Sequence, residues 1–312
     1  MAGLTNYTIK DLFGNFIDLS YVLVKRTTIT GVPNIVTNFK SNGTDIGRLF
    51  EPSTFSISSS PVGTTRSDTY YTYLEITAAT TITVINGRGV QFYYLAVGGG
   101  GASGIRNSNN GSGGGGGGGM VAGTFSLSSG SITVTVGNGG SGFESLAVGG
   151  DSTINIPNYS LITAGGGGNG GGVSGSLNAS PGRATNGSGG GGGGSGNAGE
   201  KTGNGLGGTG GASTPGVRGG GGGGMGGNGS DGNVSDGAGG AGLRPSDLGF
   251  CPNGTQYSTT YYSYGGNGSP KTPQSVENTN AAPGSGAAGG GGLSAGTGKD
   301  GIVIIAYALF RA

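Results

Sequence analysis

Between residues 68 and 163 the chain alternates apolar and polar side chains with the period of two that is typical of β-strands. Successive side chains of a strand point to opposite faces of a sheet, so each alternating stretch predicts a strand with two different faces. In the first stretch, Tyr71, Tyr73 and Glu75 alternate with Thr72, Leu74 and Ile76. Later stretches rich in β-branched or aromatic residues predict further strands at 82–85, 90–97, 121–127, 132–136, 154–156 and 159–162.

Short turn sequences separate these predicted strands. Asn86-Gly87 lies between the second and third, and Ser128-Ser129-Gly130 lies between 121–127 and 132–136. Asn-Gly flanked by apolar runs is a strong hairpin signal, so the sequence predicts that each turn joins two paired strands. Beyond the first 25 residues no segment has a convincing apolar period of 3.6, and we expect little helix.

The sequence ends in a further apolar strand, predicted over 302–310. This strand has little to pack against unless it returns to the strands that precede residue 165. Such a return would tie both ends of the intervening glycine region, 164–300, to one core.

Glycine accounts for 82 of the 312 residues, and much of it occurs in separate runs such as 98–101, 113–119 and 219–224. Two interpretations are open: the runs are flexible linker, or each is a polyproline-II-like rod packed against its neighbours. Rods without side chains can approach closely enough for lateral backbone hydrogen bonds. The closing strand favours the ordered interpretation. The predicted fold is therefore mainly β, a β-sandwich-like core with a packed, polyproline-II-like glycine region.

Residues 1–67 are predicted to form an N-terminal anchoring module, and 68–312 the glycine-rich domain. Within the module, Asp18 and Asp45 lie 27 positions apart, and each is followed by an aliphatic residue and then a short apolar pair. An Asp that caps a short helical segment after a turn would produce this echo.

Charge and chemistry exclude several classes of function. Fifteen basic and 14 acidic residues nearly balance and form no basic stripe, so nucleic acid is not an expected partner. There is no histidine, the carboxylates form no acid/base pair, and no base to activate a serine can be named. We expect no enzyme, no catalytic residue, no cofactor and no metal. Gly226–Asp231 begins like a calcium-binding repeat, but Asn233 stands where a large apolar residue belongs.

Localisation signals are also sparse. The longest apolar run, at 302–310, is far shorter than the roughly 20 residues of a membrane-spanning helix. No secretory signal is visible at the first residues, and the single cysteine, Cys251, cannot form an internal disulfide. An inert free thiol is the favoured interpretation of Cys251, and pairing between chains is the alternative.

One loop has a distinctive surface composition. It concentrates four tyrosines among Thr, Ser and Asn, namely Tyr257, Tyr261, Tyr262 and Tyr264. Tyrosine with small polar neighbours is typical of recognition surfaces, and flat aromatic faces suit sugars or proteins. The alternative is that these rings fill the sparse core of the glycine domain, and the sequence does not decide between the two.

Several pieces of the sequence resemble the glycine-rich domain of virion structural proteins, found in bacteriophage tail-fibre adhesins and in minor capsid or fibre-type proteins of large DNA viruses. They are FYYLAVGGGG at 92–101, the run 113–119, ITVTVGNGG at 132–140 and KDGIVIIAY at 299–307. NGTDIGRLFEP at 42–52 resembles a motif that precedes such domains. The resemblance implies glycine rods that form a sandwich in some adhesins, with loops between rods that contact host receptors.

The expected function is therefore that of a non-enzymatic virion protein that cements or is displayed on the particle. Its N-terminal module would bind other virion proteins. The first alternative is a receptor-binding adhesin at a fibre tip, with a host surface glycan or protein as partner. The second is a cell-wall or extracellular glycine-rich structural protein, which the missing secretion signal disfavours.

Overall fold

The computed structural model divides the chain into two compact units, Met1–Ser56 with Leu309–Ala312, and Ile57–Ala308. The residues that the structure describes are 8–10, 16–18, 40–41, 44–45, 56–61, 63–87, 90–105, 111–141, 148–172, 218–232, 237–269, 282–286 and 296–308.

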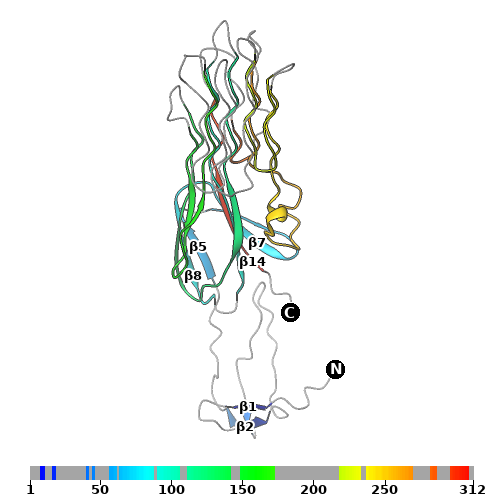
Figure 1. Cartoon of the computed structure of the whole chain (residues 1–312). Helices are drawn as coiled ribbons and strands as arrows, with labels where there is room; N and C mark the ends of the chain where they lie inside the picture. Colours follow the sequence, from blue (N-terminus) through cyan, green and yellow to red (C-terminus); the bar gives the residue numbers. More distant parts are fainter. Residues whose placement is uncertain are drawn as a thin grey trace. The chain divides into compact units, whose positions relative to one another are not determined.

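The described part of the first unit consists of two short antiparallel strand pairs (Figure 1). β1 (Thr8–Lys10) pairs with β2 (Phe16–Asp18), and β3 (Lys40–Ser41) pairs with β4 (Thr44–Asp45). Asp18 and Asp45 are thus the last residues of the second strand in each pair. The pattern repeated after 27 residues thus corresponds to two strand pairs. The helical segments that Asp18 and Asp45 were predicted to cap lie outside the described residues.

The second unit contains two five-stranded sheets, which confirms the predicted mainly-β sandwich. The first sheet has the order β10-β9-β14-β7-β6 and the second the order β13-β12-β11-β8-β5. The strands of the first sheet are β6 (Thr64–Ser67), β7 (Tyr71–Ile76), β9 (Phe92–Val97), β10 (Met120–Phe125) and β14 (Ile302–Ala308). Those of the second are β5 (Ser56–Ser60), β8 (Thr80–Ile85), β11 (Gly130–Thr135), β12 (Ser152–Asn155) and β13 (Ile162–Ala164).

The alternation in the sequence explains how the two sheets pack. In the second sheet one face is buried. The residues that alternate with the buried ones along β8 and β11 are mostly hydroxyl-bearing and face outward. The buried side chains include Ile82, Val84, Ile132, Val134 and Ile154. Contacts of β9 with β12 and β13 pack this face against the first sheet. The buried Ser152 hydroxyl also joins the sheets, because it donates to the carbonyl of Val97 at 2.6 Å.

β14 closes the first sheet, as the sequence predicted. It lies between β9 and β7 and is antiparallel to both, with Ile304 opposite Leu95 on one side and Glu75 on the other. Residues 302–306 of this strand are all buried. Both ends of the glycine region are therefore joined to one core.

The predicted hairpins were wrong. β8 pairs with β11, and β9 pairs with β10 and β14, so the Asn86-Gly87 turn carries the chain from one sheet to the other. The 128–130 turn does the same in the reverse direction. The two turns lie side by side, with the amide of Gly87 donating to the carbonyl of Ser128 at 2.7 Å. Asn86 has the left-handed φ of 57° that Asn tolerates, which explains the turn but not the pairing.

The glycine segments continue the strands as extended rods that run side by side (Figure 1). β9 passes directly into the rod 98–105, and the rod 111–119 passes into β10. Backbone amides three residues apart in one rod donate hydrogen bonds to the same neighbouring rod. The amides of the two intervening residues donate to other segments. Gly98, Gly101 and Gly104 donate to Gly119, Gly116 and Gly113 at 2.8–2.9 Å, whereas Gly99 donates to Gly150 and Gly100 to Lys299. A period of three is that of a polyproline-II helix, so the rods are polyproline-II-like and ordered.

The rods pack too closely for side chains. A Cβ placed on Gly101 would lie 2.0 Å from the carbonyl oxygen of Gly168, and one on Gly115 would lie 2.1 Å from that of Gly101. Glycine is therefore required at these positions by the approach of neighbouring backbones. The flexible-linker alternative is therefore excluded for the described rods, and the run 189–194 lies outside the described residues.

Candidate binding surface on the cover segment

Residues 243–264, here called the cover segment, lie over the outer face of the first sheet. A reciprocal backbone bridge between Leu243 and Tyr262 closes the segment, with both hydrogen bonds at 3.0 Å. A short 3-10 helix, η2 (Pro245–Leu248), follows the bridge. Gly249 ends it with a φ of 75°, a left-handed conformation that glycine adopts without steric cost.

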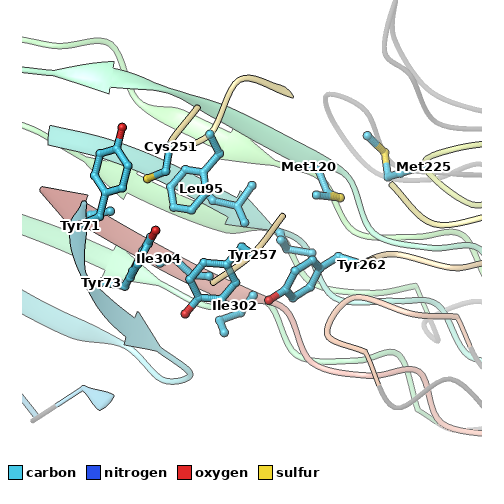
Figure 2. Packing of buried hydrophobic residues seen from close by; sticks show 13 residues of the cluster. Tyr71, Tyr73, Leu95, Met120, Met225, Cys251, Tyr257, Tyr262, Ile302 and Ile304 are labelled. Atoms are coloured by element: carbon cyan, nitrogen blue, oxygen red, sulfur yellow. The ribbon is translucent and has the colours of Figure 1, made fainter. Parts of the chain in front are cut away.

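The inner side of the cover segment completes an aromatic core (Figure 2). Tyr257 packs edge-on against Tyr73 of β7, with ring centroids 5.0 Å apart, and Phe250 lies 6.3 Å from the same ring. Tyr262, Met120 and Met225 are buried in the same cluster. Tyr71 and Tyr73 of β7, Leu95 of β9 and Ile304 of β14 belong to this cluster and would be exposed without the cover. The cover segment therefore replaces a third layer of secondary structure.

Asp68 fastens the cover segment to the sheet. Its carboxylate accepts hydrogen bonds from the Tyr73 hydroxyl and the Thr255 amide, both at 2.7 Å, and from the amides of Tyr70 and Tyr71 at 2.8 Å. Burial alone raises the pKa of Asp68, but these donors outweigh it and hold the pKa well below its ordinary range. The carboxylate is thus charged and joins residues almost 190 positions apart.

A second polar contact lies beside the first. Glu75 of β7 accepts a hydrogen bond from the Tyr257 hydroxyl and pairs with Arg66 of β6 at 2.8 Å. Burial, followed by the hydrogen bond to Glu75, raises the pKa of Tyr257. Tyr257 is therefore a neutral structural donor at physiological pH.

The outer side of the cover segment carries an exposed aromatic surface. The Tyr261 side chain is 41% exposed, and its ring lies under the guanidinium of Arg244, 5.6 Å from the ring centroid. Asp247 holds that guanidinium in a fork, with Nη2–Oδ1 at 2.9 Å and Nε–Oδ2 at 3.2 Å. The half-buried Tyr264 ring lies 6.2 Å from that of Tyr261, tilted by 44°. We call Arg244, Asp247, Tyr261 and Tyr264 the outer tyrosine surface.

The four predicted tyrosines are thus divided between two roles. Tyr257 and Tyr262 are buried and fill the core, so they are not part of an exposed contact surface. Tyr261 and Tyr264 lie together on the outside. Arg244 and Asp247 were not among the predicted contact residues, although their spacing of three residues around Pro245 indicates a short helical turn whose ends can pair.

Other chemistry in the described ranges is limited. They contain no group of three or more His, Cys, Asp or Glu residues that could hold a metal ion. Cys251 is buried, and burial raises the pKa of its thiol, which makes it unreactive. None of the helical turns in this part of the chain has the length and apolarity that a membrane crossing requires.

A sandwich whose strands extend into packed glycine rods defines a glycine-rich structural domain. Comparison with protein families agrees: the model of the glycine-rich domain family matches residues 76–308, more than half of the chain, and this chain belongs to that family. No curated protein matches the chain.

Proposed function

We propose that this chain is a non-enzymatic structural protein of a virus particle, which it cements or on which it is displayed. The observation that carries the proposal is the continuity of strands and rods. β9, β10 and β14 each join a rod directly, and hydrogen bonds link every third residue of adjacent rods. Rods linked in this way keep their shape without a side-chain core of their own.

A rigid element of this kind suits the presentation of surfaces on a particle. In this proposal the first unit, Met1–Ser56, attaches to other virion proteins, and the second unit is displayed on the particle or cements it. The division at Ser56/Ile57 falls within the predicted module of residues 1–67, and β6 of that module pairs with β7 of the second unit. Attachment by the N-terminal residues remains a prediction.

Proteomic analysis of purified particles tests the proposal directly. We expect the protein in the particles at a fixed copy number, and we expect a chain lacking residues 1–55 to be folded but absent from them. Recovery of the protein only from host wall or extracellular fractions would instead favour a glycine-rich wall protein. Normal incorporation of the truncated chain would contradict N-terminal attachment.

The second candidate function, a receptor-binding adhesin, is favoured by one specific observation. Among the described residues, Tyr261 is one of only five large hydrophobic residues that are exposed, and it is the one held beneath an arginine. Tyr261→Ser should then abolish host attachment without affecting particle assembly. Tyr159→Ser, which alters a similarly exposed tyrosine in the turn between β12 and β13, should affect neither.

A further inference from the structure

The outer tyrosine surface combines an apolar face with paired polar groups. Tyr261 and Tyr264 present two rings at 44° to one another, and the guanidinium of Arg244, which is paired with Asp247, lies over the first ring. The pyranose ring of a sugar has the complementary character, with C–H groups on its faces and hydroxyls around its edge. The tyrosine rings can therefore pack against a sugar ring, and the ion pair over Tyr261 can bind its hydroxyls.

The ion pair determines which sugars fit. Asp247 neutralises Arg244 across two contacts of 2.9 and 3.2 Å, so the surface has no unbalanced positive charge to attract an anion. The pair still presents N–H donors beside carboxylate acceptors. Two adjacent hydroxyls of a sugar can accept from one and donate to the other. This arrangement selects neutral glycans with vicinal hydroxyls over sialylated or sulfated ones.

The surface is also held in place before any ligand binds. Arg244 and Tyr261 directly flank the reciprocal bridge of Leu243 with Tyr262, which fixes the distance between their backbones. Gly242 leaves room for the Tyr264 ring, because a Cβ there would lie 3.1 Å from two ring carbons. A binding site whose side chains are already ordered loses less entropy when it binds.

We infer that Arg244, Asp247, Tyr261 and Tyr264 form a binding site for neutral glycans with vicinal hydroxyls. The inference deepens the adhesin candidate and uses the same surface. It does not depend on location in a virion, because its test uses the purified protein alone. Failure of the glycan test would leave the structural proposal standing, and absence from particles would leave the glycan site standing.

Saturation-transfer NMR with the purified full chain tests the site. The probes are neutral oligosaccharides of glucose, galactose, mannose and N-acetylglucosamine at millimolar concentration, together with a sialylated trisaccharide. We expect saturation of at least one neutral probe and none of the sialylated one. Tyr261→Ala and Asp247→Asn should each weaken binding about 10-fold or more, which corresponds to about 1.4 kcal/mol.

The matched control is Tyr159→Ala, which removes a tyrosine of similar exposure, 44%, in the turn between β12 and β13. It should leave glycan binding unchanged. Circular dichroism and unfolding curves establish that each variant is folded. No saturation of any neutral probe, preference for the sialylated probe, or equal weakening by Tyr159→Ala would each overturn the inference.

Discussion

In the sandwich, buried side chains stabilise the structure, and in the glycine rods the backbone does. Ile304 in β14 and Ile132 in β11 are both completely buried among other side chains. Gly101 in the adjoining rod is equally buried, but its neighbours are the carbonyl groups of other glycines. At Val97-Gly98 the chain passes from the sandwich, stabilised by side chains, into a rod that is stabilised by backbone contacts.

This difference determines how each part tolerates change. A sandwich loses stability when apolar volume is removed or charge is added, whereas a rod bundle loses it when any atom is added. Glycine also loses more backbone entropy on folding than other residues do. The rods therefore depend on many simultaneous hydrogen bonds and on anchorage at the sandwich.

The largest expected effect is that of Ile304→Asp in the strand that closes both parts. Ile304 is 0% exposed, so the variant buries a charge without a partner. We expect a loss of more than about 4 kcal/mol in the free energy of unfolding, or insoluble protein. Urea unfolding and proteolysis measure it. Thr133→Asp, on the exposed face of β11, is the control and should cost about 1 kcal/mol or less. A soluble, equally resistant Ile304→Asp protein would show that the strand is peripheral.

In the rods, adding one methyl group should be nearly as damaging. The Cβ of Gly101→Ala would lie 2.0 Å from the Gly168 carbonyl oxygen, so two rods must separate. We expect a loss of about 3 kcal/mol and faster hydrogen exchange at the amides of 113–119. At Gly227 the nearest atom to an added Cβ is 3.8 Å away. Gly227→Ala should therefore be neutral or stabilise by about 0.5 kcal/mol. Equal effects of the two substitutions would contradict close rod packing.

The comparison also explains what could be predicted from the sequence. Alternation over Tyr71–Ile76 and the apolar run of β14 predicted strands, because burial of one or both faces leaves that pattern in the residues. The order of the strands could not be predicted, since Asn86-Gly87 indicates a turn whether the next strand pairs with the last or crosses to the other sheet. Rods were foreseen from the glycine runs, but their neighbours depend on backbone contacts that leave no pattern of side chains.

The candidate surface was only partly predictable for a related reason. Composition marked the tyrosines but gave no sign of which rings the cover segment would turn inward. That choice follows from the bridge of Leu243 with Tyr262, which directs Tyr262 inward and Tyr261 outward. Asp68, which holds the segment, lies almost 190 residues before Thr255, and no local pattern connects them.

A third, intermediate effect is expected where the cover segment meets the sheet. Asp68→Asn removes the charge that accepts six hydrogen bonds, four of them at 2.7–2.8 Å, and we expect a loss of about 1–3 kcal/mol at pH 7. Because folding lowers the pKa of Asp68, its contribution is present above the unfolded pKa of about 3.9 and decreases as the pH falls below it. The difference between the variant and the original protein should therefore shrink below pH 4.

Urea unfolding between pH 2.5 and 7 measures this difference. The control is Asp247→Asn, which alters an exposed carboxylate paired with Arg244 and should change stability little. A stability difference for Asp68→Asn that stays constant across this pH range would mean that the charge of Asp68 does not fasten the segment.

The smallest effects should come from the few side chains inside the bundle. The hydroxyls of Ser112 and Ser269 lie 2.8 Å apart, both buried, and the Ser112 amide donates to the Ser269 hydroxyl at 3.2 Å. Ser269→Ala thus deprives both the hydroxyl and the amide of Ser112 of a partner, while Ser112→Ala deprives only the Ser269 hydroxyl. Neither substitution adds an atom, so the rods need not move.

We therefore expect Ser112→Ala to cost about 1 kcal/mol and Ser269→Ala about 2 kcal/mol, because an unpaired buried donor costs more than a lost hydroxyl contact. Thermal or urea unfolding of the two variants measures the order. If Ser112→Ala were the more damaging, or if either matched Gly101→Ala, side chains would stabilise the bundle as they do the sandwich. The expected order, with both effects below that of one added methyl group, is what a bundle stabilised by its backbone requires.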